Sequence, residues 1–184
     1  MSITLSWDLF IIVFFAVIMT YTFIIGKKES VKVILSSYAA IVTVQAVGNL
    51  MQKYASDLEV VWSSFGLTQS VEVVSMVKLF LFLAIILFLA IRGGFTVEYA
   101  NDENVIVTTA LTSLVGFATA GLLLTTLLTY VAGVPLLDAA LTHATTLSPI
   151  IQQSQFMQIM IFNQELWFAA PALLLVVIGF VGNQ

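Results

Sequence analysis

The stretch LFIIVFFAVIMTYTFIIGKKESVK, residues 9–32, decides the fold, because an unbroken apolar run is followed at once by three lysines. Residues 9–26 are about long enough to cross the ~30 Å hydrocarbon core of a bilayer as a helix. A cleaved signal peptide would carry its basic residues before the apolar run, but residues 1–8 contain neither Lys nor Arg. The sequence therefore predicts an uncleaved first transmembrane helix.

The composition of the whole chain predicts the same environment. Hydrophobic residues make up 60% of the 184 and charged residues 9%, against roughly 45–50% and about 25% in soluble domains. We therefore expect one integral membrane domain, residues 1–184, folded as an all-α polytopic bundle in the lipid bilayer. Its four transmembrane helices are predicted at residues 9–26, 31–51, 72–91 and 105–131.

Basic residues predict the orientation of these helices. Four of the six Lys and Arg residues follow the first and third apolar runs: Lys27, Lys28, Lys32 and Arg92. Short loops rich in such residues stay on the cytoplasmic side of a membrane. The N-terminus is accordingly predicted outside, although the same lysines also solvate a turn.

The second apolar run carries polar residues on one helical face. Tyr38, Gln45, Asn49 and Gln52 are spaced so that they lie together on a helix. Because lipid offers no hydrogen-bonding partner, this face is expected to point at other helices. Two interpretations stay open: the residues form hydrogen bonds between helices, or they line a polar pathway.

Lys78 falls about one turn inside the third predicted span. Its ammonium either extends outward to the headgroups or acts as a functional intramembrane cation facing Gln45 and Asn49. The candidate functional polar residues are therefore Lys78, Gln45, Asn49 and Tyr38.

Small residues recur every fourth position in the fourth predicted span. Thr112, Gly116 and Ala120 form a seam that lets helix backbones approach closely. We expect this seam to be a packing surface, either inside the bundle or between two copies of the chain.

The C-terminal third differs from the rest. Residues 134–164 are predicted to form amphipathic interfacial helices, the second starting with Ser148 as N-cap and Pro149 as first helical residue. His143 lies on a polar face, where it is expected to be solvated. The apolar residues 166–181 are short for a span, so they predict a fifth span, a re-entrant segment or a helix packed on the bundle.

Several kinds of site are disfavoured by the residues available. The chain has no cysteine and one histidine, and its ten carboxylates show no ligand-like clustering, so no metal or other cofactor is expected. No basic run with interleaved aromatics suits nucleic acid. No nucleophile with an adjacent base is evident, so no catalytic residue is predicted and the chain is not expected to be an enzyme.

The opening SWDLFIIVFFAVIMTYTFIIGKKESVKVILSSYAAIV, residues 6–42, resembles the colicin V production protein (CvpA) family of small bacterial inner-membrane proteins. The matching positions are Asp8, Gly26, Lys28 and Glu29. The segment from Gly116 to Gly121 is similar to the glycine-bearing last span of that family.

The likeness extends over roughly residues 7–131. The family's arginine–glycine pair in the first turn and its arginine before the last span are missing, and the apolar C-terminal run is extra. The resemblance implies a location in the bacterial inner membrane and a link to envelope processes and colicin V secretion, with no catalytic residues to transfer.

Two functional hypotheses follow. The first is a non-enzymatic envelope protein that assists assembly or export and contacts other membrane proteins. The second is a small channel or transporter subunit, for which the polar face and Lys78 would line the pathway. A homo-oligomer is compatible with both, since one bundle of this size is small for a pore.

Overall fold

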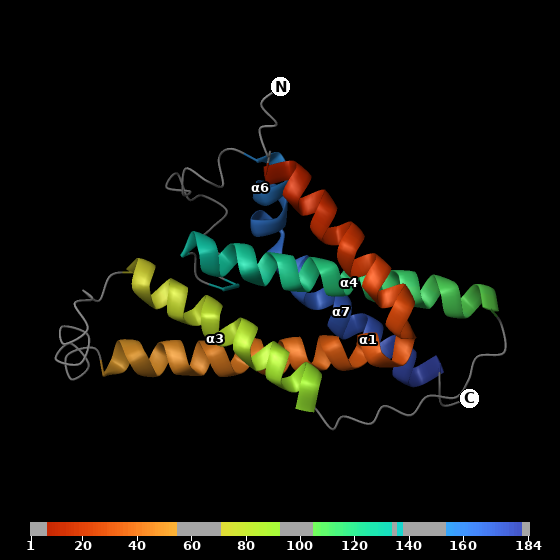
Figure 1. Cartoon of the computed structure of the whole chain (residues 1–184), viewed down its shortest axis with the longest axis horizontal. Coiled ribbons are helices and arrows are strands. Elements are labelled where there is room, and N and C mark those ends of the chain that lie inside the picture. Colours follow the sequence, from red (N-terminus) through yellow and green to blue (C-terminus); the bar gives the residue numbers. More distant parts are fainter. Residues whose placement is uncertain (1–6, 55–70, 93–104, 134–135, 138–153, 182–184) are drawn as a thin grey trace.

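The computed structural model describes residues 7–54, 71–92, 105–133, 136–137 and 154–181, and all regular structure within them is helical (Figure 1). The predicted all-α class is thus confirmed for this part of the chain. The helices are α1 Trp7–Lys53, α3 Val71–Arg92, α4 Val105–Ala132, α6 Gln155–Phe162 and α7 Gln164–Val181.

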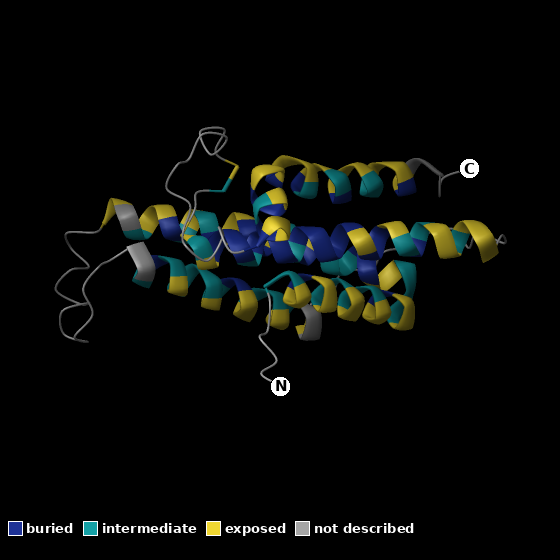
Figure 2. Cartoon of the chain, turned by 90° about the horizontal axis from the view of Figure 1, so that it is seen from above, coloured by how far each residue is buried: buried dark blue, intermediate teal, exposed yellow. Residues whose placement is uncertain are grey.

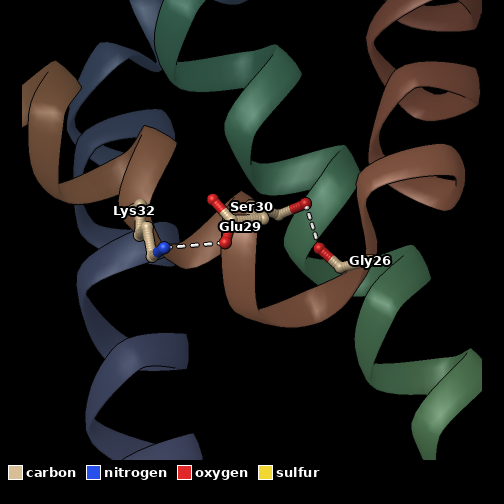
Figure 3. A network of polar contacts seen from close by, with 4 residues as sticks. All are labelled: Gly26, Glu29, Ser30 and Lys32. Carbon is tan, nitrogen blue, oxygen red and sulfur yellow. Dashed lines mark hydrogen bonds and ion pairs between the residues drawn. The ribbon is translucent and has the colours of Figure 1, made fainter. Parts of the chain in front are cut away.

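Helix α1 folds back on itself at a single residue. Gly26 has φ 80° and ψ 174°, a conformation that only glycine adopts readily, and helix continues on both sides of it. We expected a turn over residues 27–30, but those residues are helical because Gly26 alone provides the change of direction. The Ser30 hydroxyl donates to the Gly26 carbonyl at 2.9 Å, and Lys32 pairs with Glu29 at 2.7 Å (Figure 3).

Helix α4 occupies the centre of the molecule. It packs against α1, α3, α6 and α7, and fourteen of its residues are buried. Figure 2 shows its middle turns as the longest buried stretch, with the neighbouring helices exposing their outer faces. A helix packed against several neighbours needs small side chains where they approach, and α4 supplies them at Gly116, Ala118, Ala120 and Gly121.

The threonines of α4 are accommodated by their own backbone. The hydroxyls of Thr112, Thr119, Thr126 and Thr129 each donate to the carbonyl four residues earlier, at 2.6–2.7 Å. Such internal bonds satisfy a hydroxyl without a partner on another helix. The central helix can therefore be rich in threonine and still be enclosed.

The chain ends in a bent helix pair. Helices α6 and α7 meet at Asn163 with an angle of 64° between them. Helix α6 lies within the segment predicted to be interfacial, residues 134–164, and it buries Met157, Met160 and Ile161 against α1 and α4. This helix begins at Gln155 with Ser154 as its N-cap, whereas His143, Ser148 and Pro149 lie outside the described residues.

By length and composition, two of the described helices can cross a membrane. They are the Trp7–Met51 part of α1 and α4. The α6–α7 pair counts as a third if it forms one bent span, and the apolar part of α3, Val73–Leu89, is shorter. These helices fit a membrane protein.

Candidate functional site

The side chain of Lys78 lies across the backbone of α1. A methyl group added to Gly48 would overlap Lys78 Cε and would come within 3.0 Å of its Nζ. Lys78 therefore occupies the space that a side chain at position 48 would fill. Gly48 makes this approach possible because it has no Cβ, and α1 and α3 pack together around the contact.

Gln45 lies one turn before Gly48 on the same face of α1. Residues three apart on a helix are neighbours, with about 5–6 Å between their Cβ positions. Its Oε1 is buried and has no hydrogen-bond partner among the described residues. The structure thus places Lys78 against α1 at Gly48, with Gln45 one turn away along α1.

The other two predicted polar residues lie elsewhere. The Tyr38 hydroxyl donates a hydrogen bond to the Phe168 carbonyl of α7, so it joins two helices. Asn49 is exposed, so the expectation that the whole polar face points at other helices does not hold for it. Of this polar face, Tyr38 therefore bonds to another helix, Gln45 has its oxygen buried, and Asn49 lies on the outer surface.

A second buried polar atom lies between α3 and α4. Phe82, one turn after Lys78, is fully buried and packs edge-on against Tyr130 of α4, with 5.6 Å between ring centroids. The Tyr130 hydroxyl is buried without a hydrogen-bond partner in the described part of the chain. Sequence reasoning missed Tyr130, because an aromatic residue near a predicted helix end is commonly interfacial.

The basic residues used to predict orientation are at or near the surface. Lys28 and Arg92 are exposed, and Lys27 and Lys32 are partly exposed. Lys27, Lys28 and Lys32 follow the Gly26 kink directly, so three positive charges lie beside the bend inside α1.

The predicted packing seam of α4 is buried. Thr112, Gly116 and Ala120 all lie inside the bundle, and a methyl group on Gly116 would be 3.0 Å from both Met19 and Thr22 of α1. Within the described structure the seam therefore faces α1. That position favours packing inside the bundle over the open alternative of a dimer contact.

A closer contact was not predicted. The indole of Trp167 lies on Gly121, where a methyl group would overlap its ring atoms Cε3 and Cζ3. The same indole contacts Phe15 and Phe117, with centroid distances of 6.0 and 5.6 Å. Gly121 lies off the four-residue seam, so only its proximity to Gly116 in the sequence could have suggested a second close approach.

Asp8 links the start of α1 to the start of α6. Its carboxylate accepts a hydrogen bond from the Ser154 hydroxyl and a longer one, 3.4 Å, from the Phe156 backbone N–H. Ser154 in turn accepts from the Met157 N–H at 3.1 Å, as an N-cap does. A carboxylate at a helix N-terminus is stabilising, so this cluster is explained by holding α6 against α1.

The described residues provide little for cofactor chemistry. No group of three His, Asp or Glu side chains that could hold a metal ion occurs among them. Comparison of the chain with protein-family models, with curated proteins and with solved structures finds no match. The arrangement at Lys78 therefore stands as the candidate site on its geometry alone.

Proposed function

We propose that the chain is a non-enzymatic integral membrane protein that assists assembly or export at the cell envelope. The membrane location is supported by the large apolar side chains that the outer helices expose around the more buried helix α4. Each outer helix exposes such residues by a third of their area or more, for example Ile24 (78%), Phe80 (77%) and Leu166 (66%). A surface of this kind is stable in lipid and would aggregate in water.

The proposed number of crossings follows from helix lengths. A straight helix over Trp7–Met51 would be on the order of 70 Å long, more than twice the hydrocarbon thickness, so α1 has to supply two crossings separated at Gly26. Its halves, residues 7–26 and 27–53, are about 30 and 40 Å long. With α3 and α4 the chain crosses four times, and the bent α6–α7 pair adds a fifth crossing.

The orientation in this proposal has the N-terminus outside. Lys27, Lys28 and Lys32 beside the kink favour a cytoplasmic location for the bend in α1. In Figure 1 the end of α7 lies toward the same side of the molecule as the kink and the start of α4. A cytoplasmic C-terminus is therefore part of the proposal.

This orientation can be tested because the chain has no cysteine, so single cysteines can be introduced without background. Glu29→Cys and Tyr54→Cys are exposed positions near the two ends of the second half of α1, and neither changes a lysine. We expect a membrane-impermeant maleimide to label Tyr54→Cys in intact cells and Glu29→Cys only after permeabilisation. The reverse pattern would invert the topology.

The accessory role is supported by how polar groups are used. Four buried threonines of α4 bond to their own helix, Tyr38 joins α1 to α7, and Asp8 holds the N-terminus of α6. These polar groups serve packing within the bundle, and the exposed apolar faces remain available to lipid or to another membrane protein. The likeness to the CvpA family, with its link to envelope processes, favours the same role.

A transporter or channel subunit is the second candidate, and the contact of Lys78 with Gly48 beside Gln45 favours it. Purified protein in sealed liposomes distinguishes the two. Ion or solute flux that Lys78→Leu abolishes and Lys53→Leu leaves unchanged would support transport. Tight liposomes, together with a stoichiometric membrane partner retained through purification, would support the accessory role.

A further inference from the structure

We propose that Glu165, beside the break between α6 and α7, is the contact site for a basic residue in a transmembrane helix of another membrane protein. The inference rests on the membrane embedding and the accessory role proposed above. It deepens that role, because it names the surface of this chain that meets the partner and the chemistry that the partner brings.

The carboxylate of Glu165 is unpaired. Glu165 is exposed and makes no hydrogen bond or ion pair with any described residue. The backbone N–H groups of Leu166 and Trp167 both donate to the Asn163 carbonyl, so Glu165 is not used as a cap of α7. Its place in the first turn of α7 is favourable for a negative charge, yet the helix dipole leaves the carboxylate oxygens without a hydrogen-bond donor. The side chain therefore contributes no polar contact to the described bundle.

Helix α4 indicates the depth of this carboxylate. The Trp167 indole lies on Gly121, which is about 16 Å from the end of α4 at Ala132. Helix α4 is about 42 Å long, so a hydrocarbon core ~30 Å thick leaves about 6 Å uncovered at each end. Glu165 precedes Trp167 by two residues, about 3 Å of helix, so it lies inside the hydrocarbon. Figure 1 agrees, because α7 starts beside the middle turns of α4 and not at its end.

The surface around Glu165 is apolar. Leu166, Leu173 and Val176 of α7 are 66%, 64% and 54% exposed, and Ile159 of α6 is 54% exposed. In Figure 2 the helix that leads to the C-terminus shows exposed residues along its outer side. Lysine and arginine reach the headgroups from such a depth through long stems, but glutamate has only two methylene groups. An ionised carboxylate in this position is costly unless a cation pairs with it.

A second copy of the chain would not supply that cation. Three of the six basic residues lie beside the Gly26 bend, and Lys53 and Arg92 lie in the last turns of α1 and α3. Lys78 lies one turn before Phe82, which packs on Tyr130 near the end of α4. None of these described cations is at the depth of Glu165, and a symmetric pair would bring two carboxylates together. The charge therefore fits a different membrane protein whose helix carries Lys or Arg inside the bilayer.

The first experiment measures the depth of Glu165. A spin label at Glu165→Cys in liposomes is compared with labels at Val176→Cys and Lys53→Cys. We expect Glu165→Cys to be relaxed more strongly by oxygen than by a water-soluble nickel complex, as Val176→Cys is. Nickel accessibility at Glu165→Cys equal to that at Lys53→Cys, with Val176→Cys protected, would overturn the inference and leave the membrane proposal standing. Nickel access to Val176→Cys as well would overturn both.

The second experiment supplies the chemistry of the partner. The probe is a transmembrane peptide of Leu and Ala, about 23 residues long, with one Lys a third of the way along, and its match carries Leu there. Association with protein labelled at Tyr54→Cys is measured in liposomes by energy transfer. We expect the Lys peptide to bind about tenfold more tightly than the Leu peptide, as for one charge-assisted hydrogen bond.

Three variants assign this preference to one carboxylate. Glu165→Gln should abolish it, and Glu165→Asp, which keeps the charge, should retain part of it. Glu29→Gln is the control, because it changes an exposed carboxylate beside the bend, and it should keep the full preference. Circular dichroism checks that each variant is folded.

Two results would overturn the proposed partner. One is equal binding of the two peptides by the wild type, or a preference for the Lys peptide that survives Glu165→Gln. The other is energy transfer between two labelled copies of the chain that Glu165→Gln abolishes, which would identify a second copy as the occupant of this surface.

Discussion

Helices α3 and α4 are both strongly apolar, yet they occupy opposite positions in the molecule. Half of the residues of α4 are buried by its neighbours, whereas among the described side chains of α3 only Val74 and Phe82 are buried. The two sequences differ in side-chain size: α4 contains seven threonines and two glycines, and α3 contains neither residue type but is filled with Leu, Ile and Phe.

The difference shows that hydrophobicity does not decide which helix is central in this chain. In lipid, leucine gains nothing by moving from the acyl chains to a helix interface, so close packing decides. Gly116 and Gly121 let α1 and Trp167 approach the α4 backbone, while the bulky side chains of α3 leave it on the periphery.

The two faces of α3 provide the largest contrast. Phe82 is fully buried against Tyr130, and Phe80 is 77% exposed. We expect Phe82→Ala to lower the free energy of unfolding by about 3 kcal/mol, because it leaves a cavity. Phe80→Ala should change it by less than about 0.5 kcal/mol. Denaturation by SDS in mixed micelles, followed by circular dichroism, gives both values, and equal values would mean that the two faces are not distinct.

The close approach of Trp167 to α4 gives the next largest effect. Gly121→Ala should destabilise the protein by about 2 kcal/mol, since the Trp167 ring is held between Phe15 and Phe117 and has to move. Gly179→Ala is the control, because nothing lies within 4 Å of that position. The same unfolding measurement applies. If both variants were equally stable, close packing on α4 would not be the reason for its central position.

The kink in α1 allows both halves of that helix to cover α4. Gly26→Ala meets no neighbouring atom, so its cost comes only from the backbone conformation at φ 80°. We expect about 1.5 kcal/mol of destabilisation. Unfolding of Gly26→Ala beside Gly179→Ala measures this term, and a neutral result would show that α1 does not depend on the bend.

The threonines of α4 are expected to contribute least. Thr126→Val removes a bond from the hydroxyl to the Leu122 carbonyl and should cost about 0.6 kcal/mol. Thr125→Val should be neutral or stabilising, because the Thr125 hydroxyl is buried without a partner among the described residues. A larger loss in Thr125→Val than in Thr126→Val would indicate a partner for Thr125.

The helices of this chain were largely predictable, and their contacts only in part. The boundaries of α3 and α4 lie within a residue or two of the expected spans, because apolar runs ending at Arg92 and Gly133 mark them. Small residues indicated the seam at Gly116. The bend at Asn163, the Trp167 contact and the Asp8–Ser154 link were missed, since each joins residues whose proximity no periodic pattern expresses.

The prediction for the candidate site was incomplete for the same reason. The spacing of Gln45 and Asn49 places both on neighbouring parts of one helix face, yet the structure covers one and exposes the other. How closely Lys78 approaches α1 depends on how α3 packs on α1. That packing in turn depends on Gly48, a residue with no side chain to mark a site.

The central claim is that the exposed apolar faces contact lipid. Spin labels at Phe80→Cys, Leu87→Cys and Val176→Cys, with Lys53→Cys as the aqueous reference, test it directly in the cysteine-free chain reconstituted in liposomes. We predict that the three apolar positions are relaxed strongly by oxygen and weakly by a water-soluble nickel complex, and that Lys53→Cys shows the reverse. Nickel accessibility at Phe80→Cys equal to that at Lys53→Cys would contradict the account.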